Sequence, residues 1–137
     1  MAKTPVTLKV DGYADREVTE VAYSFSRGTS NDGQPSGIAR GGKIIVTIKA
    51  LNDGNCDMLE WINNTGKGKK GSLYFADASD QSKKMKEITF ENAYCVEFTE
   101  SWREKGEKDA TLPHTEKVVI SCQKITNGQA SYENEWA

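Results

Sequence analysis

Apolar and polar residues alternate over much of the chain, which is the pattern of strands with one buried face. The alternation begins at Val6–Val10 and returns from about Arg16 to Ser26. Asp11-Gly12, between these two runs, is a turn signal. The first two segments therefore predict a hairpin. The second run has one apolar face, made of Val21, Tyr23 and Phe25.

The segment Lys43–Leu51 also alternates, but it carries apolar residues on both faces. One face holds Ile44, Val46, Ile48 and Ala50. Ile45 lies on the opposite face, which would normally be polar. Strands that are apolar on both faces are typically buried on both. We therefore expect this strand to be covered on both sides near its start.

The sequence predicts one helix, from about Cys56 to Asn64. Its apolar residues recur at helical spacing, at Met58, Trp61 and Ile62. Asp57, with Glu60 three residues later, resembles a capping box, and Asn55 is a competing N-cap. A short helix among about seven strands would close one open end of a barrel.

A strand at Ser72–Ala78 is followed by a turn at Asp77–Ser82 and by a long alternating run from Met85 to about Trp102. Asn92-Ala93 indicates a bend or turn within this run. We expect its even-numbered apolar residues to share one face: Ile88, Phe90, Tyr94, Val96, Phe98 and Trp102.

The last third of the chain predicts a charged hairpin tip at Arg103–Pro113 and then a strand at Thr115–Ile125. The inward residues of that strand are Val118, Ile120 and Cys122. Val119 lies on its outer face. Asn127-Gly128 is a strong hairpin-turn signal, so Ser131–Trp136 could close the sheet as a last strand.

Together these elements predict an all-β chain of short strands with one helix, organised as a single domain over residues 1–137. A small barrel or a sandwich fits the spacing. No internal repeat or low-complexity segment is present.

The segment Arg27–Gly42 (RGTSNDGQPSGIARGG) differs from the rest because it has five glycines and Ile38 as its only large apolar residue. It reads as a long connection without regular structure between two strands. Such a loop is either disordered or held by something outside its own domain. With apolar Ile45 and Val119 on faces that should be wet, it suggests contacts between subunits.

Composition limits the function further. The formal net charge is −2, which gives no electrostatic reason to expect nucleic acid or an anionic membrane surface. The N-terminus lacks the apolar core of a secretory signal, and no apolar run is long enough to span a membrane. The three cysteines are widely spaced and fit free thiols in the cytoplasm better than a disulfide framework.

The sequence offers little catalytic chemistry. His114 is the only histidine and is expected in a surface loop, with no nucleophile motif beside it. Glu87, Glu91 and Glu97 fit a solvated strand face. The Gly- and Lys-rich segment 66–72 lacks the spacing of a phosphate-binding loop, and the residues offer neither a metal site nor a cofactor site.

Two functions from different classes remain. One is a structural subunit that assembles with copies of itself. The other is a monomeric barrel that binds a small ligand in a cavity lined by Trp61, Tyr94 and Trp102. Aromatic residues in small barrels more often fill the core than line a pocket, which favours the first.

Four segments, in this order and spacing, resemble the Hcp (TssD) tube protein of the type VI secretion system, in its Bacteroidetes form. They are AYSFSRGTSNDGQPSGIARGGKIIVTI at 22–48, DMLEWINN at 57–64, ITFENAYCVEFTESW at 88–102 and ENEWA at 133–137. The resemblance extends from near Thr7 to the C-terminus.

This resemblance implies a non-enzymatic β-barrel with a helix at one end, in hexameric rings that stack into a tube. A contractile sheath would fire the tube, which would carry a VgrG spike and effectors in its lumen, and the subunit would leave the cytoplasm through this apparatus. The resemblance also implies that the long loop contacts the next ring. The residues expected there are Ser30, Asp32, Gln34, Ser36, Ile38 and Arg40, with Ile45 and Val119 at contacts within a ring.

Overall fold

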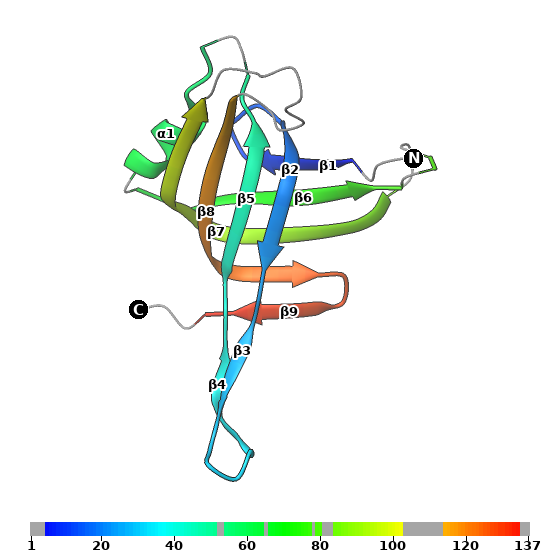
Figure 1. The fold of residues 1–137 in the computed structure, drawn as a ribbon, viewed down its shortest axis with the longest axis vertical. Helices are drawn as coiled ribbons and strands as arrows, with labels where there is room; N and C mark the ends of the chain where they lie inside the picture. The colour runs from blue at the N-terminus through cyan, green and yellow to red at the C-terminus, as the bar shows by residue number, and fades with distance from the viewer. Residues whose placement is uncertain are drawn as a thin grey trace.

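The computed structural model describes residues 5–51, 54–64, 66–77, 79–80, 84–102 and 114–134. Within these ranges the chain forms nine strands and one short helix (Figure 1). The elements are β1 (Val6–Val10), β2 (Arg16–Tyr23), β3 (Ser26–Thr29), β4 (Pro35–Arg40), β5 (Lys43–Lys49), α1 (Asp57–Asn63), β6 (Lys69–Ala76), β7 (Lys84–Trp102), β8 (His114–Asn127) and β9 (Ala130–Glu133).

Six strands close into an antiparallel barrel in the order β5-β2-β1-β6-β7-β8, and β5 pairs with β8 to complete the circle. This confirms the all-β prediction with one helix and decides between barrel and sandwich. β8 is longer than β5, so its second half continues beyond the barrel and pairs with β9 instead. The turn before β9 contains Gly128 at φ +64°, as the Asn127-Gly128 signal predicts.

The barrel core comes from the inward positions that alternation predicts. Ile44, Val46 and Ile48 of β5 are fully buried, and so are Val118, Ile120 and Cys122 of β8. These residues form one continuous apolar cluster with partners from β1, β6 and β7. Apolar burial from both halves of the chain therefore holds the barrel closed.

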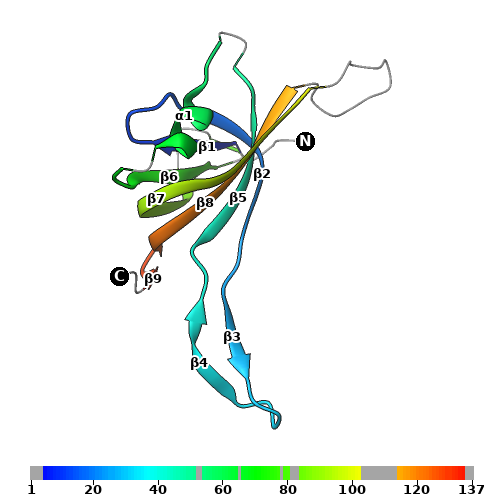
Figure 2. The same cartoon turned by 90° about the vertical axis from the view of Figure 1, so that its left-hand side faces the viewer.

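The helix α1 packs on β7 at the part of the barrel away from β3 and β4 (Figures 1 and 2). Met58 is fully buried and Trp61 is 2% exposed, which confirms the predicted apolar face. The predicted capping box does not form. The side chain of Asn55 accepts a hydrogen bond from the Asp57 amide at 3.1 Å, while the Asp57 carboxylate accepts one from the Ala14 amide at 3.1 Å. Asp57 thus ties the helix to the β1–β2 connection.

The long strand β7 contradicts the prediction of one even-numbered apolar face. Ile88 and Phe90 are buried, but the buried positions then change to Ala93 and Cys95. The cause is Asn92, whose φ of +51° lies in the left-handed region and shifts the alternation by one residue. A second irregularity between Cys95 and Glu97 shifts it back. Of the residues expected on the inner face, Val96 is instead 45% exposed and Trp102 is 70% exposed.

Several boundaries also differ from the predictions. β2 ends at Tyr23, β6 begins at Lys69, and His114 is the first residue of β8 and not part of a loop. The hairpin tip predicted at Arg103–Pro113 lies outside the described residues.

Candidate functional site

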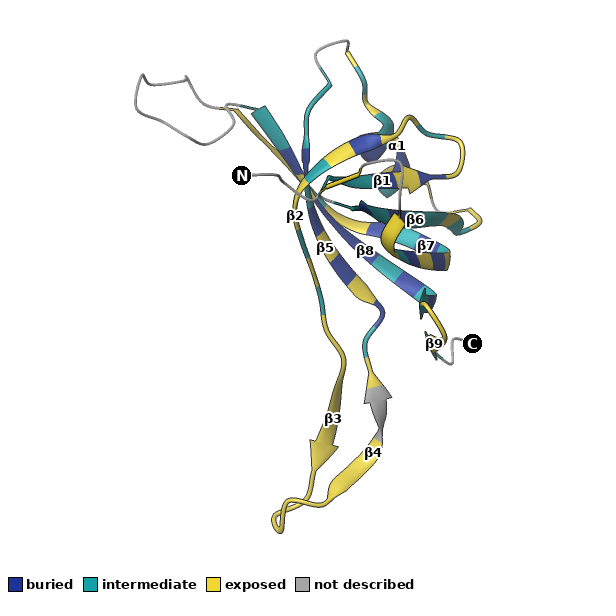
Figure 3. Ribbon diagram, turned by 90° about the vertical axis from the view of Figure 1, so that its right-hand side faces the viewer, coloured by how far each residue is buried: buried dark blue, intermediate teal, exposed yellow. Residues whose placement is uncertain are grey.

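The segment predicted as an irregular loop is a β-hairpin. β3 pairs antiparallel with β4 in a separate two-stranded sheet. We call β3, β4 and the turn between them the arm. It projects well beyond the barrel (Figure 2), and the described side chains of β3 and β4 are exposed (Figure 3). A hairpin without a buried face has no apolar alternation, which explains why the pattern did not reveal it.

The tip of the arm is held by its own polar residues. The Gly33 amide donates to the carbonyl of Ser30 at 2.9 Å, and the Ser30 amide donates to the carbonyl of Gln34 at 2.8 Å. The Asp32 carboxylate accepts from the Ser30 hydroxyl and from the Gln34 amide. These bonds, the Ser30 hydroxyl first, lower the pKa of Asp32, because they favour the ionised carboxylate that accepts them.

The six residues predicted for stacking therefore lie on one projecting unit. Ser30, Asp32, Gln34, Ser36 and Arg40 are exposed, whereas Ile38 lies in β4 and its side chain is outside the description. Ser30 and Asp32 form hydrogen bonds within the tip turn, so their side chains stabilise the arm itself. The described side chains of the arm are mostly polar, and they form no catalytic arrangement.

The two residues predicted for contacts within a ring are neighbours on the outer face of the barrel. Ile45 of β5 pairs directly with Val119 of β8. Ile45 is 42% exposed, so nothing in this chain covers it fully. Val119 was expected to be open on the outer face but is only 7% exposed. Val96, in the irregular part of β7, is 45% exposed and was missed.

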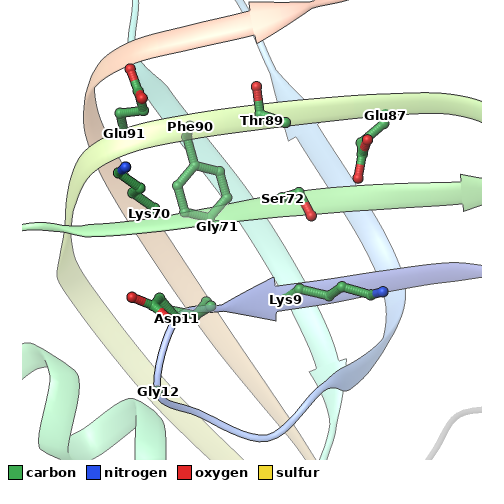
Figure 4. A pocket seen from close by; sticks show the side chains of 11 residues that line it. Lys9, Asp11, Gly12, Lys70, Gly71, Ser72, Glu87, Thr89, Phe90 and Glu91 are labelled. Atoms are coloured by element: carbon green, nitrogen blue, oxygen red, sulfur yellow. The ribbon is translucent and has the colours of Figure 1, made fainter.

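The structure does not support the predicted ligand cavity. Trp61 is buried between helix and barrel, while Trp102 is 70% exposed at the end of β7, so the predicted aromatic residues do not line one space. A shallow polar groove of about 730 Å³ instead crosses β1, β6 and β7 on the outer surface (Figure 4). Its walls carry both signs of charge: Lys9, Lys70, Glu87 and Glu91.

The described part of the chain also offers little for catalysis. It contains no group of three or more His, Cys, Asp or Glu residues that could hold a metal ion. His114 pairs with the exposed Glu100 at 2.7 Å between Nε2 and Oε2. Burial raises the pKa of the Cys95 thiol to about 11 and that of Cys122 to about 12, so both thiols are protonated and unreactive at neutral pH. Within the described ranges, no helix is long and apolar enough to cross a membrane.

Sequence reasoning missed two groups of residues that join distant parts of the chain. Arg16 and Glu116 form a buried ion pair inside the barrel. Tyr132 and Asn134, near the C-terminus, contact the root of the arm. Neither group has a local sequence signal, because its partners lie 91 to 100 residues apart.

Comparisons with known proteins agree with this geometry. Residues 2–137 match the family described as Hemolysin coregulated protein Hcp (TssD). The structure of Hcp1 from Flavobacterium johnsoniae is 31% identical, with a TM-score of 0.82 over 95% of this chain and 99% of that one. No curated protein matches significantly.

Two more distant structures share the fold alone. Hcp1 from Salmonella typhimurium is 15% identical, with a TM-score of 0.71 over 97% of this chain and 95% of that one. A chain in the sixfold-symmetrised baseplate of the anti-feeding prophage is 8% identical, with a TM-score of 0.59 over 93% of each chain.

Proposed function

The chain belongs to the Hcp (TssD) family, the structural and non-enzymatic tube proteins of the type VI secretion system, and we propose that it forms hexameric rings that stack into a tube. The number six rests on the family resemblance. It is consistent with the sixfold symmetry of the baseplate that contains a chain of the same fold.

The arm is the observation that carries this proposal. It is a preformed hairpin that stands away from the barrel, and isolated two-stranded hairpins are marginally stable in water. A neighbouring ring would supply the surface that the arm lacks. Gln34, Ser36 and Arg40 would then provide polar contacts, Ile38 an apolar one, and Ser30 and Asp32 the shape of the tip.

The outer face around Ile45 is the proposed contact within a ring. Ile45 and Val119 are paired on β5 and β8, and Val96 lies on the adjacent strand β7 beside Glu97, the residue paired with Val119; we call these three apolar residues the stripe. Ile45 and Val96 keep nearly half of their surface in water in the single chain. Burying them against a neighbour would remove that apolar surface from water, so we place the lateral contact here.

Family membership also supports the proposed partners and route. Hcp proteins are secreted by the type VI system. We propose that this subunit assembles in the cytoplasm, inside a contractile sheath and below a VgrG spike, and that effector proteins travel in the lumen of the tube. The polar face over β1, β6 and β7 shows no preference for one sign of charge, which would suit varied cargo.

The two proposed contacts can be tested separately. Ile45→Asp should abolish rings, measured as hexamers by native mass spectrometry, and leave the circular dichroism spectrum unchanged. Met85→Asp is the matched control, because Met85 is 55% exposed and lies outside the stripe.

Arg40→Glu and Ile38→Asp should leave rings intact but shorten or abolish tubes in electron micrographs. Lys70→Glu, a charge reversal at an exposed residue of β6, serves as the control for Arg40→Glu. A wild-type protein that stays monomeric at high concentration would contradict the proposal. Unfolded arm variants would contradict the expectation that these two positions do not contribute to the fold.

A further inference from the structure

The root of the arm is held by residues from the other end of the chain. The backbone amide of Gly41 donates to the hydroxyl of Tyr132 at 3.0 Å, and that hydroxyl donates to the side-chain oxygen of Asn134 at 2.6 Å. The side-chain nitrogen of Asn134 donates back to the carbonyl of Gly41 at 3.2 Å and to the carbonyl of Cys122 at 3.0 Å. Both polar groups of Gly41 are therefore bound by two side chains near the C-terminus.

Tyr132 also contacts the second leg of the arm. Its ring lies 5.0 Å from the ring of Phe25, centroid to centroid, in a tilted arrangement. Phe25 precedes β3 and Gly41 follows β4, so one tyrosine touches both strands where they leave the barrel. Figures 1 and 2 show β9 beside this root.

Close packing at the root leaves no room for side chains at the two glycines. A Cβ atom at Gly41 would lie 2.2 Å from Cδ1 of Phe25. Gly42 has a φ of +96°, and a Cβ atom there would lie 2.7 Å from the carbonyl oxygen of Cys122. The backbone at Gly41 and Gly42 therefore lies closer to Phe25 and β8 than a residue with a side chain could.

We propose that Tyr132 and Asn134 are positioning residues that set the direction of the arm, so that the C-terminal segment controls how rings stack. This inference rests on the proposed function. We refer to the contacts of Tyr132 and Asn134 with Phe25, Gly41 and Cys122 as the latch.

The direction of the arm is important because the arm is long, so a small rotation at its root becomes a large displacement at its tip. From Gly41 to Gly33 the strand extends over roughly 26 Å at about 3.3 Å per residue. A rotation of about 10° at the root therefore moves the tip by about 5 Å, which exceeds the length of a hydrogen bond. Of the six proposed stacking residues, Ser30, Asp32 and Gln34 lie at the tip and would move most, whereas Arg40 is next to Gly41 and would move little.

Unlike the backbone at Gly41 and Gly42, the ring of Tyr132 is not closely packed over its whole surface. An apolar cavity of about 290 Å³ borders it, and its lining includes Phe25, Ile125 and Tyr132. The ring of Tyr132 is thus free of close neighbours on part of its surface. Its hydroxyl, with the amide of Asn134, supplies the directional contacts that the ring alone does not.

The test measures the position of the arm in the full chain. Spin labels are attached to the natural Cys56, which is exposed, and to a cysteine introduced by Gln34→Cys at the tip. Cys95 and Cys122 are buried with raised pKa values, so they do not compete for the label. Labelled protein is diluted into an excess of unlabelled protein so that distances within one subunit dominate.

Two variants remove the latch in different ways. Tyr132→Phe retains the ring and loses the hydrogen bonds of the hydroxyl with Gly41 and Asn134. Asn134→Ala loses the hydrogen bonds of the amide nitrogen to the carbonyls of Gly41 and Cys122, together with the bond from the Tyr132 hydroxyl. Each should broaden the distance distribution between the labels and accelerate hydrogen exchange of the Gly41 amide at least about fivefold. Each should also raise the protein concentration needed for tubes, with rings unchanged. Tyr74→Phe on β6 is the matched control and should change none of these readouts.

The outcomes separate this inference from the proposed function. Unchanged label distances and Gly41 exchange in both variants would overturn the latch, and so would a fall in the unfolding midpoint of the whole barrel without a change in the arm. If the wild-type protein formed no tubes, the proposed function would fail, while the label distances would still decide whether the latch sets the arm.

Discussion

The buried ion pair between Arg16 and Glu116 leads to a sharp prediction about stability. Arg16 is 1% exposed and Glu116 is 3% exposed, and Nη2 of Arg16 lies 2.5 Å from Oε2 of Glu116. The same nitrogen donates to the carbonyl of Lys49 at 2.9 Å, and Nη1 donates to the side chain of Asn55 at 3.3 Å. Nε of Arg16 has no partner among the described residues. The pair links β2, β5 and β8 with the segment that precedes α1.

Removing one partner should cost far more than removing both. Glu116→Leu leaves the Arg16 charge buried and unpaired, which should cost roughly 3–5 kcal/mol of unfolding free energy, and Arg16→Met should cost a similar amount. In the double variant no charge remains inside the barrel. Its remaining cost is the loss of donors to Lys49 and Asn55, about 1 kcal/mol each. We therefore expect the double variant to be more stable than either single variant, with a coupling energy of at least about 3 kcal/mol.

Urea unfolding at one fixed protein concentration measures these differences, because assembly is linked to folding. The exposed pair of Lys49 and Glu17 is the matched control, with side chains that are 41% and 63% exposed. Its double-variant cycle should give a coupling energy below about 1 kcal/mol. A double Arg16→Met, Glu116→Leu variant that loses as much stability as the two single variants added together would refute the reasoning.

Two further predictions concern the core and the thiols. Trp61→Ala should lower the unfolding free energy by on the order of 3–5 kcal/mol in urea titrations, because the indole is 2% exposed, whereas Leu59→Ala on the exposed side of α1 should cost less than about 1 kcal/mol. A thiol reagent at pH 8 should modify one cysteine, Cys56, in the native protein and three in denaturant, and rapid native modification of Cys95 or Cys122 would contradict the buried, protonated state of these thiols.

Local alternation predicted those elements whose burial is regular. β1 and β5 alternate between buried and more exposed residues, so their inward residues could be read directly from the sequence, whereas β8 also buries Val119 between Val118 and Ile120. The error in β7 began at Asn92, where a single residue at positive φ shifted the period. Asn tolerates that conformation better than most residues, so a bend could be predicted there, but the resulting change of face could not.

The arm was predicted as an irregular loop because its sequence lacks the alternation that reveals the strands of the barrel. Strands are recognised from sequence by the difference between an exposed and a buried face, and the described side chains of the arm are exposed on both faces. Its glycines and polar residues therefore resembled an irregular loop. The ion pair of Arg16 with Glu116 and the latch residue Tyr132 were missed because their partners lie far away in the sequence.

The barrel core and the two surfaces that we propose for assembly are separate parts of this chain. The core lies inside a closed set of six strands, so the stability of the subunit does not require a neighbour. The arm and Ile45 contribute little to that core, and a change at either should alter assembly without unfolding the barrel. The latch joins the two parts, because Asn134 binds Cys122 of the barrel and Gly41 of the arm with the same nitrogen. Variants at the latch should therefore reduce tube formation, while the rings and the fold of the barrel stay unchanged.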